Sequence, residues 1–592
     1  MNQKRGNMST RATKRSRVVK WTGAAVLFGS VAATAPAAVV SAASAKNNLI
    51  IGINEPNAAW CTQDSPGIDQ VAAKNSVLET LTIVNDKGKI VPYTAKSVTK
   101  VGTDSKTWKV VLRDGIKYSD GSSFDATNVL LNMYAQTGLG PLVFAPAKVQ
   151  QPSLPAIAWT DLFGSSIDDL KAAYAAFIAS GQKDPSKLLA IKAKVDAAVQ
   201  IDSPTQVTFK LPSPRPNFPF QLWNYGRSAL LSTSSLKSPD CGLTAAATVG
   251  TGPFKVSSKG AFGTTADTVL EANPNYWRST KANPLPKAQQ VTFRVLGDST
   301  AKVNAVRTNA VDIATFSATE GTSLNSLKKM GKKVTLYRGP KESAWTIHLN
   351  TVPGTGSPFT SKNAREAFAY ALNVQEYAKV MTKGNGSASY AIAPPMHPYY
   401  QKNASLKYNL AKAKAAVAAY KQETGKSSLD VIIPRTTTSQ SGESGALICK
   451  QLSKAGINCT VGTAVSSTTY ILNGFGLKQQ LSVFLVSSGY YAEFANLFTT
   501  KTDLEMSGFR FTKPALAQCF TDASAKSTRA AYKNCVKDLT KESFWLPLYL
   551  EGGFLAWNKT AQGVGATPLP GGGKRPLING SGFDFASVKK TS

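Results

Sequence analysis

Short apolar runs rich in β-branched residues alternate along the chain with segments whose apolar residues recur at helical spacing. Gly, Asp and Asn bound the short runs, and Asp125 stands where a helical pattern begins, as an N-cap residue does. This alternation predicts a mixed α/β protein. The predicted strands include 48–53, 108–112, 206–211, 345–351, 429–433, 481–488 and 544–550, and the predicted helices include two exposed ones over 165–200 and others at 363–372 and 409–421.

Two of these strands bear on the architecture. Residues 481–488, LSVFLVSS, form an apolar run, which is typical of a strand buried on both faces of a sheet. Residues 544–550, FWLPLYL, read as a late strand that returns to the first section of the protein. The mixed order of elements predicts two α/β lobes, with the chain crossing between them more than once.

The first 45 residues predict a secretory signal peptide. A basic leader precedes an apolar run at 21–40, and Ala43-Ser44-Ala45 supplies the small residues that signal peptidase recognises. A membrane anchor is the alternative, but Gly23, Gly29 and Pro36 interrupt the run. No Cys stands directly after the run, so a lipoprotein site is not expected. We therefore expect a Sec-type exported protein that is secreted or held at the cell surface or in the periplasm.

The charge of the chain is strongly positive. Lys and Arg total 68 against 35 acids, a formal charge of +33. Removing the seven basic residues of the predicted signal, which contains no acid, leaves +26. The lysines are spread along the chain with only short clusters, such as Lys328-Lys329 and Lys332-Lys333. This pattern favours contact with an anionic cell-envelope surface over nucleic-acid binding, which uses basic runs interleaved with aromatic residues.

Six cysteines in an exported chain favour disulfides over metal or redox chemistry. Six cysteines allow fifteen sets of pairings. Local spacing favours one set, which pairs Cys449 with Cys459, Cys519 with Cys535, and Cys61 with Cys241. A zinc site is not expected, because the chain has two histidines and no CxxC motif.

Catalytic motifs are missing from the sequence. We find no P-loop, no HExxH and no GxSxG nucleophile elbow. His348 lies in an apolar strand and is expected to pack in a core, and the carboxylates Asp168 and Asp169 read as a solvated helix face. The sequence therefore favours a protein that is not an enzyme and uses no cofactor or metal.

Six segments, in the same order, resemble the family 5 solute-binding proteins, which are the dipeptide, oligopeptide and nickel receptors of ABC importers. The most specific is 108–127, WKVVLRDGIKYSDGSSFDAT, which is similar to that family's apolar strand followed by LRDGVKFHDGTPLTA. The RDG and SDG turns in it are scaffold features and not a binding site. The other five segments are 249–254 (VGTGPF), 273–277 (NPNYW), 291–312, 357–373 and 545–549 (WLPLY).

The resemblance implies a fold like that of type II periplasmic binding proteins. Two lobes would surround a cleft, the first lobe would carry an extra subdomain, and bound solute would stabilise the closed form. The implied division is a signal peptide at 1–45, a first lobe made of 46–75, 205–342 and 546–592, an additional subdomain at 76–204, and a second lobe at 343–545.

The family's peptide receptors bind the ligand carboxylate with an Arg and the ligand ammonium with an acid, so the resemblance implies site residues. Arg435 falls where dipeptide receptors place that Arg, although a loop Arg at the surface is an equal alternative. Tyr490 falls where the family has its Asp, and Glu493 could substitute for it. Tyr490 and Tyr491 could instead stack on an apolar, aromatic or sugar ligand, or pack in a core. The remaining candidates are Trp60 and Gly67 in the first lobe, and Trp345 and Asn350 in the crossing strand.

These observations predict an extracytoplasmic receptor that delivers a peptide or related organic solute to the permease and ATPase subunits of an ABC importer. We expect it to act as a monomer. One alternative is a secreted basic protein that keeps the fold and binds the cell envelope without transport. A third hypothesis is a hydrolase whose catalytic residues follow no motif that we recognise.

Overall fold

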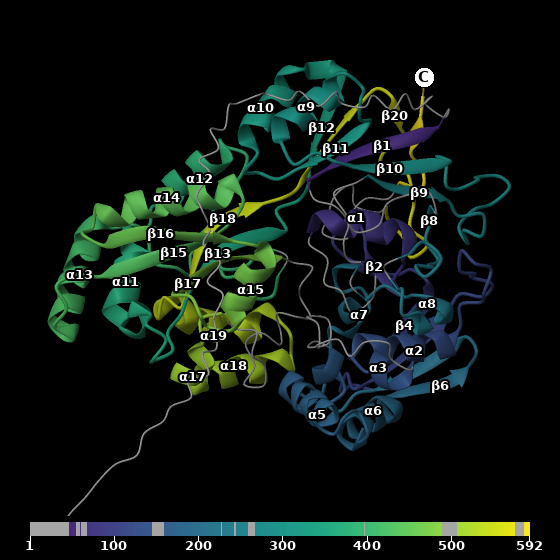
Figure 1. Ribbon diagram of the computed structural model, residues 1–592, viewed down its shortest axis with the longest axis horizontal. Helices are drawn as coiled ribbons and strands as arrows, with labels where there is room; N and C mark the ends of the chain where they lie inside the picture. The colour runs from purple at the N-terminus through teal and green to yellow at the C-terminus, as the bar shows by residue number, and fades with distance from the viewer. Residues whose placement is uncertain are drawn as a thin grey trace, which may run out of the picture. The chain divides into compact units, whose positions relative to one another are not determined.

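The computed structural model of the chain describes residues 47–54, 60, 68–144, 159–226, 228–241, 244–257, 267–395, 397–487, 506–574 and 585–591. The predicted signal peptide lies outside these ranges. Within them, helices and several separate sheets form the mixed α/β structure that the sequence predicts (Figure 1).

A seven-stranded sheet contains the first strand of the described chain. Its order is β12-β19-β11-β1-β10-β9-β8. β1 runs parallel to β10 and β11, and the other neighbours are antiparallel. Because β1 is central, Leu49 and Ile51 are fully buried. The strands are β1 (Asn48–Ile53), β8 (Phe254–Val256), β9 (Thr268–Ala272), β10 (Gln290–Val295), β11 (Ile313–Phe316), β12 (Val334–Arg338) and β19 (Phe554–Asn558).

Helices connect and flank this sheet. Asp298 caps α9 by accepting a hydrogen bond from the Ala301 amide, which is the role that an N-terminal Asp plays in helices. α9 and α10 lie side by side next to β11 and β12 (Figure 1). The elements around the sheet are α1 (Ile68–Val77), α8 (Thr233–Lys237), α9 (Ser299–Arg307), α10 (Gly321–Lys329), the 3-10 helix Gly331–Lys333, β20 (Ala561–Gln562) and β21 (Lys589–Lys590).

A separate four-stranded antiparallel sheet, β4-β5-β7-β6, is formed by strands between residues 95 and 210. Asp125 is the N-cap of α2, as its position predicts. The two helices predicted over 165–200 are α5 and α6, and each buries one face in the hydrophobic core beside this sheet. The elements are β2 (Thr82–Val84), β3 (Ile90–Pro92), β4 (Ala95–Val101), β5 (Thr107–Leu112), α2 (Ala126–Gln136), α3 (Gly140–Val143), α5 (Ile167–Ala179), α6 (Ser186–Ala198), β6 (Val199–Ser203), β7 (Gln206–Lys210), α7 (Phe218–Gln221) and the 3-10 helix Asn224–Gly226.

The rest of the chain forms a four-stranded sheet, β14-β18-β13-β17, and a parallel pair, β15-β16. Every residue of β18 is buried. The strands are β13 (Ser343–Leu349), β14 (Ser387–Ala388), β15 (Asp430–Thr436), β16 (Asn458–Val465), β17 (Leu481–Ser487) and β18 (Trp545–Glu551). The helices are α11 (Lys362–Ala371), α12 (Val374–Thr382), α13 (Leu410–Thr424), α14 (Ser439–Ser453), α15 (Ser467–Phe475), α17 (Phe509–Thr512), α18 (Pro514–Ser524), α19 (Arg529–Lys541) and the 3-10 helix Pro358–Thr360.

Two predicted boundaries differ from the strand pairing. β7 lies beyond residue 204 but pairs with β5 and β6, because a hairpin keeps its two strands together. β18 does not return to the first section, since it pairs with β13 and β14. The return comes at β19, which pairs with β11 and β12. Gly552 lies between β18 and β19, where a Cβ atom would come within 2.3 Å of the Gly339 and Pro340 carbonyl oxygens.

Two disulfides join neighbouring elements. Cys449 of α14 is bonded to Cys459 of β16, and their Cα atoms lie 5.0 Å apart. Cys519 of α18 is bonded to Cys535 of α19, at a Cα separation of 5.7 Å. These are the two pairs that the local spacing favours. Cys61 lies outside the described residues, so its pairing with Cys241 stays a prediction.

Candidate functional site

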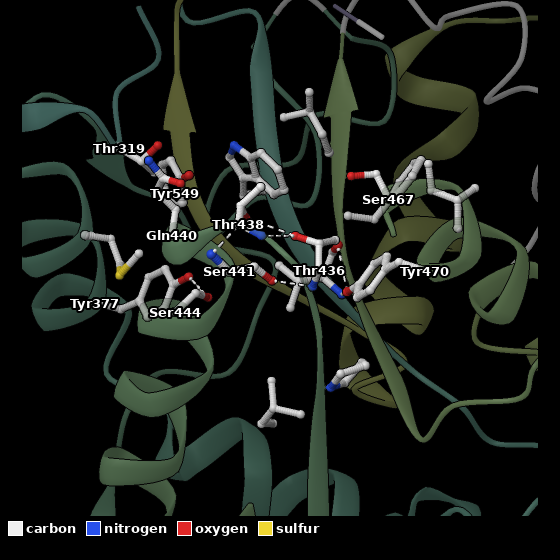
Figure 2. Close-up of a pocket in the computed structure, with 18 residues that line it drawn as sticks. Thr319, Tyr377, Thr436, Thr438, Gln440, Ser441, Ser444, Ser467, Tyr470 and Tyr549 are labelled. Atoms are coloured by element: carbon white, nitrogen blue, oxygen red, sulfur yellow. Dashed lines mark hydrogen bonds between the residues drawn. The ribbon is translucent and has the colours of Figure 1, made fainter. Parts of the chain in front are cut away.

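A cavity of about 290 Å³ lies where the β14-β18-β13-β17 sheet meets the β15-β16 pair (Figure 2). Side chains from β13, β15, β17 and β18 line it together with side chains from α12, α14 and α15. Thr319, which follows β11 of the seven-stranded sheet, also lines it. The cavity therefore collects residues that are more than 200 positions apart in the sequence.

Aromatic rings form one part of the lining. Trp345 stacks on Tyr549, with ring centroids 6.2 Å apart and planes 20° apart. The Trp345 Nε1 donates a hydrogen bond of 2.6 Å to Oε1 of Glu551. The other oxygen of Glu551 accepts a hydrogen bond of 3.1 Å from the Ala318 amide. Glu551 thus fixes the orientation of the indole and connects it to the residue before Thr319.

Hydroxyl groups form a second part of the lining, at the start of α14 (Figure 2). Thr438 caps the helix, and its hydroxyl lies 3.0 Å from the hydroxyl of Thr436. Ser441 accepts a hydrogen bond of 3.0 Å from the Thr436 amide. One turn further along the helix, the Ser444 hydroxyl lies 2.6 Å from the Tyr377 hydroxyl. These groups are held in place by one another and present oxygen atoms to the cavity.

Tyr470 of α15 supports the outer strand β17. Its hydroxyl accepts a hydrogen bond of 2.7 Å from the Val483 amide and donates one of 3.2 Å to the Val483 carbonyl. Burial raises the pKa of Tyr470 to about 12, and burial likewise raises the pKa of Tyr377 to about 12. Both phenols are therefore neutral at physiological pH.

The middle of β17 is exposed to the cavity. The sequence predicts that this apolar run is buried on both faces, but Val483, Phe484 and Leu485 are only half-buried. β17 is the edge strand of its sheet, and these three residues line the cavity. The prediction is wrong for the centre of the strand, because an apolar run can form the wall of a cavity as well as a core.

No described residue that lines the cavity carries a charge. The lining consists of aromatic rings, aliphatic groups, hydroxyls and the Gln440 amide. A buried charge without a partner is costly, so a ligand enclosed by these walls is favoured when it is neutral. The volume lies at the small end of ligand pockets, which indicates a compact molecule.

The predicted site residues fall in different places. Trp345 lines the cavity. Arg435 is not among the lining residues, and its Nε donates a hydrogen bond of 3.2 Å to the Gly462 carbonyl. The Asn350 side chain is buried and donates to the carbonyls of Leu477 and Gln479. Trp60 is buried in the core beside the seven-stranded sheet. Four candidates, Gly67, Tyr490, Tyr491 and Glu493, lie outside the described residues.

Sequence reasoning missed most of this lining. Tyr377, Tyr470 and Tyr549 come from three separate elements with no shared motif. One signal was present: the run TTTSQSGES at 436–444 places hydroxyls between the end of a strand and the start of a helix. In α/β proteins, ligands bind at such carboxyl ends of strands.

Both histidines of the chain are buried. His348 is buried with its ring centroid 3.6 Å from that of Trp545, and burial lowers its pKa to about 3. His397 is also buried, and its pKa is likewise lowered to about 3. Within the described ranges, no three His, Cys, Asp or Glu side chains form a group that could hold a metal ion. No helix in these ranges has the length and apolar character needed to cross a bilayer.

Comparison with known proteins adds the family and the fold. The model of the bacterial extracellular solute-binding proteins, family 5 Middle, matches residues 89–499. The glutathione-binding protein GsiB of Escherichia coli strain K12 is 25% identical over 382 residues, which are 64% of this chain and 62% of that protein. The chain spans about three fifths of the length of the curated relatives that it matches.

Two solved structures resemble the chain over 92% of its length. One is the pheromone receptor PrgZ, described with its mode of peptide binding, at a TM-score of 0.70, 17% identity and 100% coverage of that chain. The other is AgaA from A. tumefaciens R10 in complex with agropinic acid, at a TM-score of 0.70, 18% identity and 99% coverage of that chain. At these identities the likeness concerns the fold, and it confirms the predicted α/β class of periplasmic solute-binding proteins.

Proposed function

Because the chain belongs to family 5 of the bacterial extracellular solute-binding proteins, we propose that it captures a compact organic solute outside the cytoplasm and delivers it to the permease and ATPase subunits of an ABC importer. The relatives that support this role are binding proteins and not enzymes. These related proteins bind glutathione, a peptide and agropinic acid, which are different organic molecules. The class of solute is therefore inferred from this chain's own cavity.

The uncharged lining of the cavity carries the proposal. Trp345 and Tyr549 offer flat apolar surface, while Thr436, Ser441 and Ser444 offer hydroxyls. This combination favours a neutral solute that has one aromatic or aliphatic group and several hydrogen-bonding atoms. A peptide fits when its terminal charges are blocked or lie outside the enclosed space. The family's usual pair of charged anchors has no counterpart among the described lining residues.

Capture is coupled to the arrangement of the sheets through Thr319 and Glu551. Thr319 belongs to the connection after β11, whereas every other described lining residue comes from Trp345 or later in the chain. A solute that contacts both Thr319 and the later lining residues stabilises the conformation in which these residues are close together, because it binds that conformation more tightly. The permease would then recognise that conformation.

Calorimetry with matched peptides tests the solute class. We expect an aromatic dipeptide with an acetylated N-terminus and an amidated C-terminus to bind at least about tenfold more tightly than the same dipeptide with free termini, because only the free form must desolvate two charges. Native mass spectrometry of the purified protein would identify any solute that co-purifies. Tighter binding of the zwitterionic form, or co-purification of charged peptides, would contradict the proposal.

A further inference from the structure

A second cavity, of about 450 Å³, lies at the C-terminal ends of α9 and α10, beside the start of β12 and the end of β19. Four of its lining residues are cationic, and no described lining residue is acidic: the four are Arg307, Lys329, Lys333 and Lys559. All four side chains belong to exposed residues. We call this the basic cavity. It shares no lining residue with the cavity lined by Trp345 and Tyr549, which we call the uncharged cavity.

The four cations of the basic cavity are not neutralised by neighbours. Within the described parts of the chain, none of them forms an ion pair, and the Arg307 Nη2 donates only to the neutral Asn304 side chain, at 3.2 Å. Lys302 of the same helix α9 provides a contrast, because it is buried and lies 2.7 Å from Glu320. The cations around the basic cavity are therefore available to a ligand.

The helix ends account for only part of this charge. A helix C-terminus carries about half a negative charge, and cations in the last turn are favourable there. Two such ends balance about one of the four positive charges. The remainder surrounds a concave surface, and a hollow lined by charges of one sign raises the local concentration of ions of the opposite sign.

The floor of the basic cavity is held in position by Asn558. Its amide donates to the carbonyls of Val306 and Val311, at 3.2 Å and 2.8 Å. These hydrogen bonds join the end of α9 to β19, so they fix the backbone that carries Arg307 relative to the backbone that carries Lys559. Charged groups on a fixed base lose less conformational freedom on binding than charges on a mobile tail.

We propose that the basic cavity binds phosphodiester groups of a linear anionic polymer of the cell envelope. Arg and Lys together are the usual protein ligands of phosphate oxygens. A concave site accepts a single polymer strand, whereas a flat lipid surface contacts protruding lysines. Nucleic acid is disfavoured because no described lining residue is aromatic, so no base can stack there. The site would hold the exported receptor at the envelope and does not depend on which solute it carries.

Binding of a linear poly(glycerol phosphate) tests the proposal, with the affinity measured by calorimetry at low salt. The double variant Lys329→Gln/Lys333→Gln removes two of the four cations. We expect about fivefold weaker binding for each lysine removed. We also expect the slope of log affinity against log salt concentration to fall by about two. The matched control is Lys414→Gln/Lys421→Gln, which removes two exposed lysines of α13. It should leave the affinity within about twofold of that of the unsubstituted protein, since neither lysine lines the basic cavity.

Three outcomes would overturn the proposal. The first is equal loss of affinity in both double variants, which would show that binding depends on net charge alone. The second is binding to phosphatidylglycerol vesicles that depends on Lys329 and Lys333 when polymer binding does not, which would assign the site to a membrane. The third is tighter binding of a single-stranded oligonucleotide of equal charge. A melting temperature close to that of the unsubstituted protein will show that each variant is folded.

Discussion

The two cavities of this protein differ in every property that selects a ligand. The uncharged cavity is built from buried tyrosines, a tryptophan and hydroxyls that are hydrogen-bonded to one another, and no described lining residue is charged. The basic cavity is built from exposed cations that form no ion pair with any described residue. The net charge of +33 therefore says nothing about the solute. A basic protein can keep a neutral binding site when its charge is confined to the solvated surface, where it is well hydrated.

Salt should separate the two cavities most strongly. Raising NaCl from about 50 mM to about 200 mM should lower the affinity for poly(glycerol phosphate) by about 100-fold, because each phosphate contact releases counterions from the polymer. The affinity for a neutral solute should change by less than about twofold, since no ion pair forms. Parallel titrations of both ligands at several salt concentrations measure this. Equal salt dependence of the two ligands would mean that the solute also binds through charge.

Substitution of Trp345 should give the next largest effect, and only on the solute. Trp345→Ala removes the ring that stacks on Tyr549, and we expect the solute affinity to fall about 30-fold, or about 2 kcal/mol, as for aromatic residues that anchor a ligand. Trp345→Phe keeps an aromatic ring but loses the hydrogen bond to Glu551, so its solute affinity should lie between that of the unsubstituted protein and that of Trp345→Ala. Polymer binding should be unchanged in both variants. Loss of polymer binding in a folded Trp345→Ala protein would mean that the cavities are not independent.

The hydroxyl pair of Tyr377 and Ser444 should contribute less than Trp345. Tyr377→Phe removes one hydrogen bond, and we expect about fivefold weaker solute binding, or about 1 kcal/mol. Ser444→Ala breaks the same bond from the other side. The two effects should therefore overlap in the double variant, which a double-mutant cycle by calorimetry measures. Full additivity would show that the two hydroxyls contact the solute separately.

Local signals predicted much of the fold. The apolar run at 48–53 became β1, the cap at Asp125 starts α2, and the short cysteine spacings match two disulfides. Each of these depends on neighbouring residues only. The predicted return of 544–550 to the first section was wrong because it also depended on neighbouring residues only. The apolar run of β18 is compatible with either the seven-stranded sheet or the β14-β18-β13-β17 sheet, and only the long-range pairing with β13 decides between them.

The site was much less predictable than the fold. Trp345 was a candidate, but the other aromatic lining residues, Tyr377, Tyr470 and Tyr549, were not. Their approach depends on how α12, α15 and β18 pack, and no local pattern encodes that packing. The resemblance directed attention to charged anchors such as Arg435, which lies outside the lining and bonds to Gly462. A family pattern transfers the scaffold more readily than the specificity, because the scaffold needs fixed turns and cores while the site can be rebuilt residue by residue.

Changing the pH should have the smallest effect on solute binding. We expect the affinity to stay within about twofold from pH 5 to pH 9, because no described lining residue is an Asp, Glu, His, Lys or Arg. Burial raises the pKa of Tyr377 and Tyr470 to about 12, so both phenols stay protonated over this range.

The stability of the fold should depend on pH more than solute binding does. The pKa of buried His348 is lowered to about 3, so the unfolded chain binds more protons below its ordinary pKa of 6.5, and the stability contributed by neutral His348 is lost as pH falls from about 6.5 toward 3. Calorimetry of solute binding, paired with thermal unfolding at each pH, separates the pH dependence of affinity from that of stability. A change in affinity with a midpoint between pH 5 and pH 9 would require a titrating group that contacts the solute.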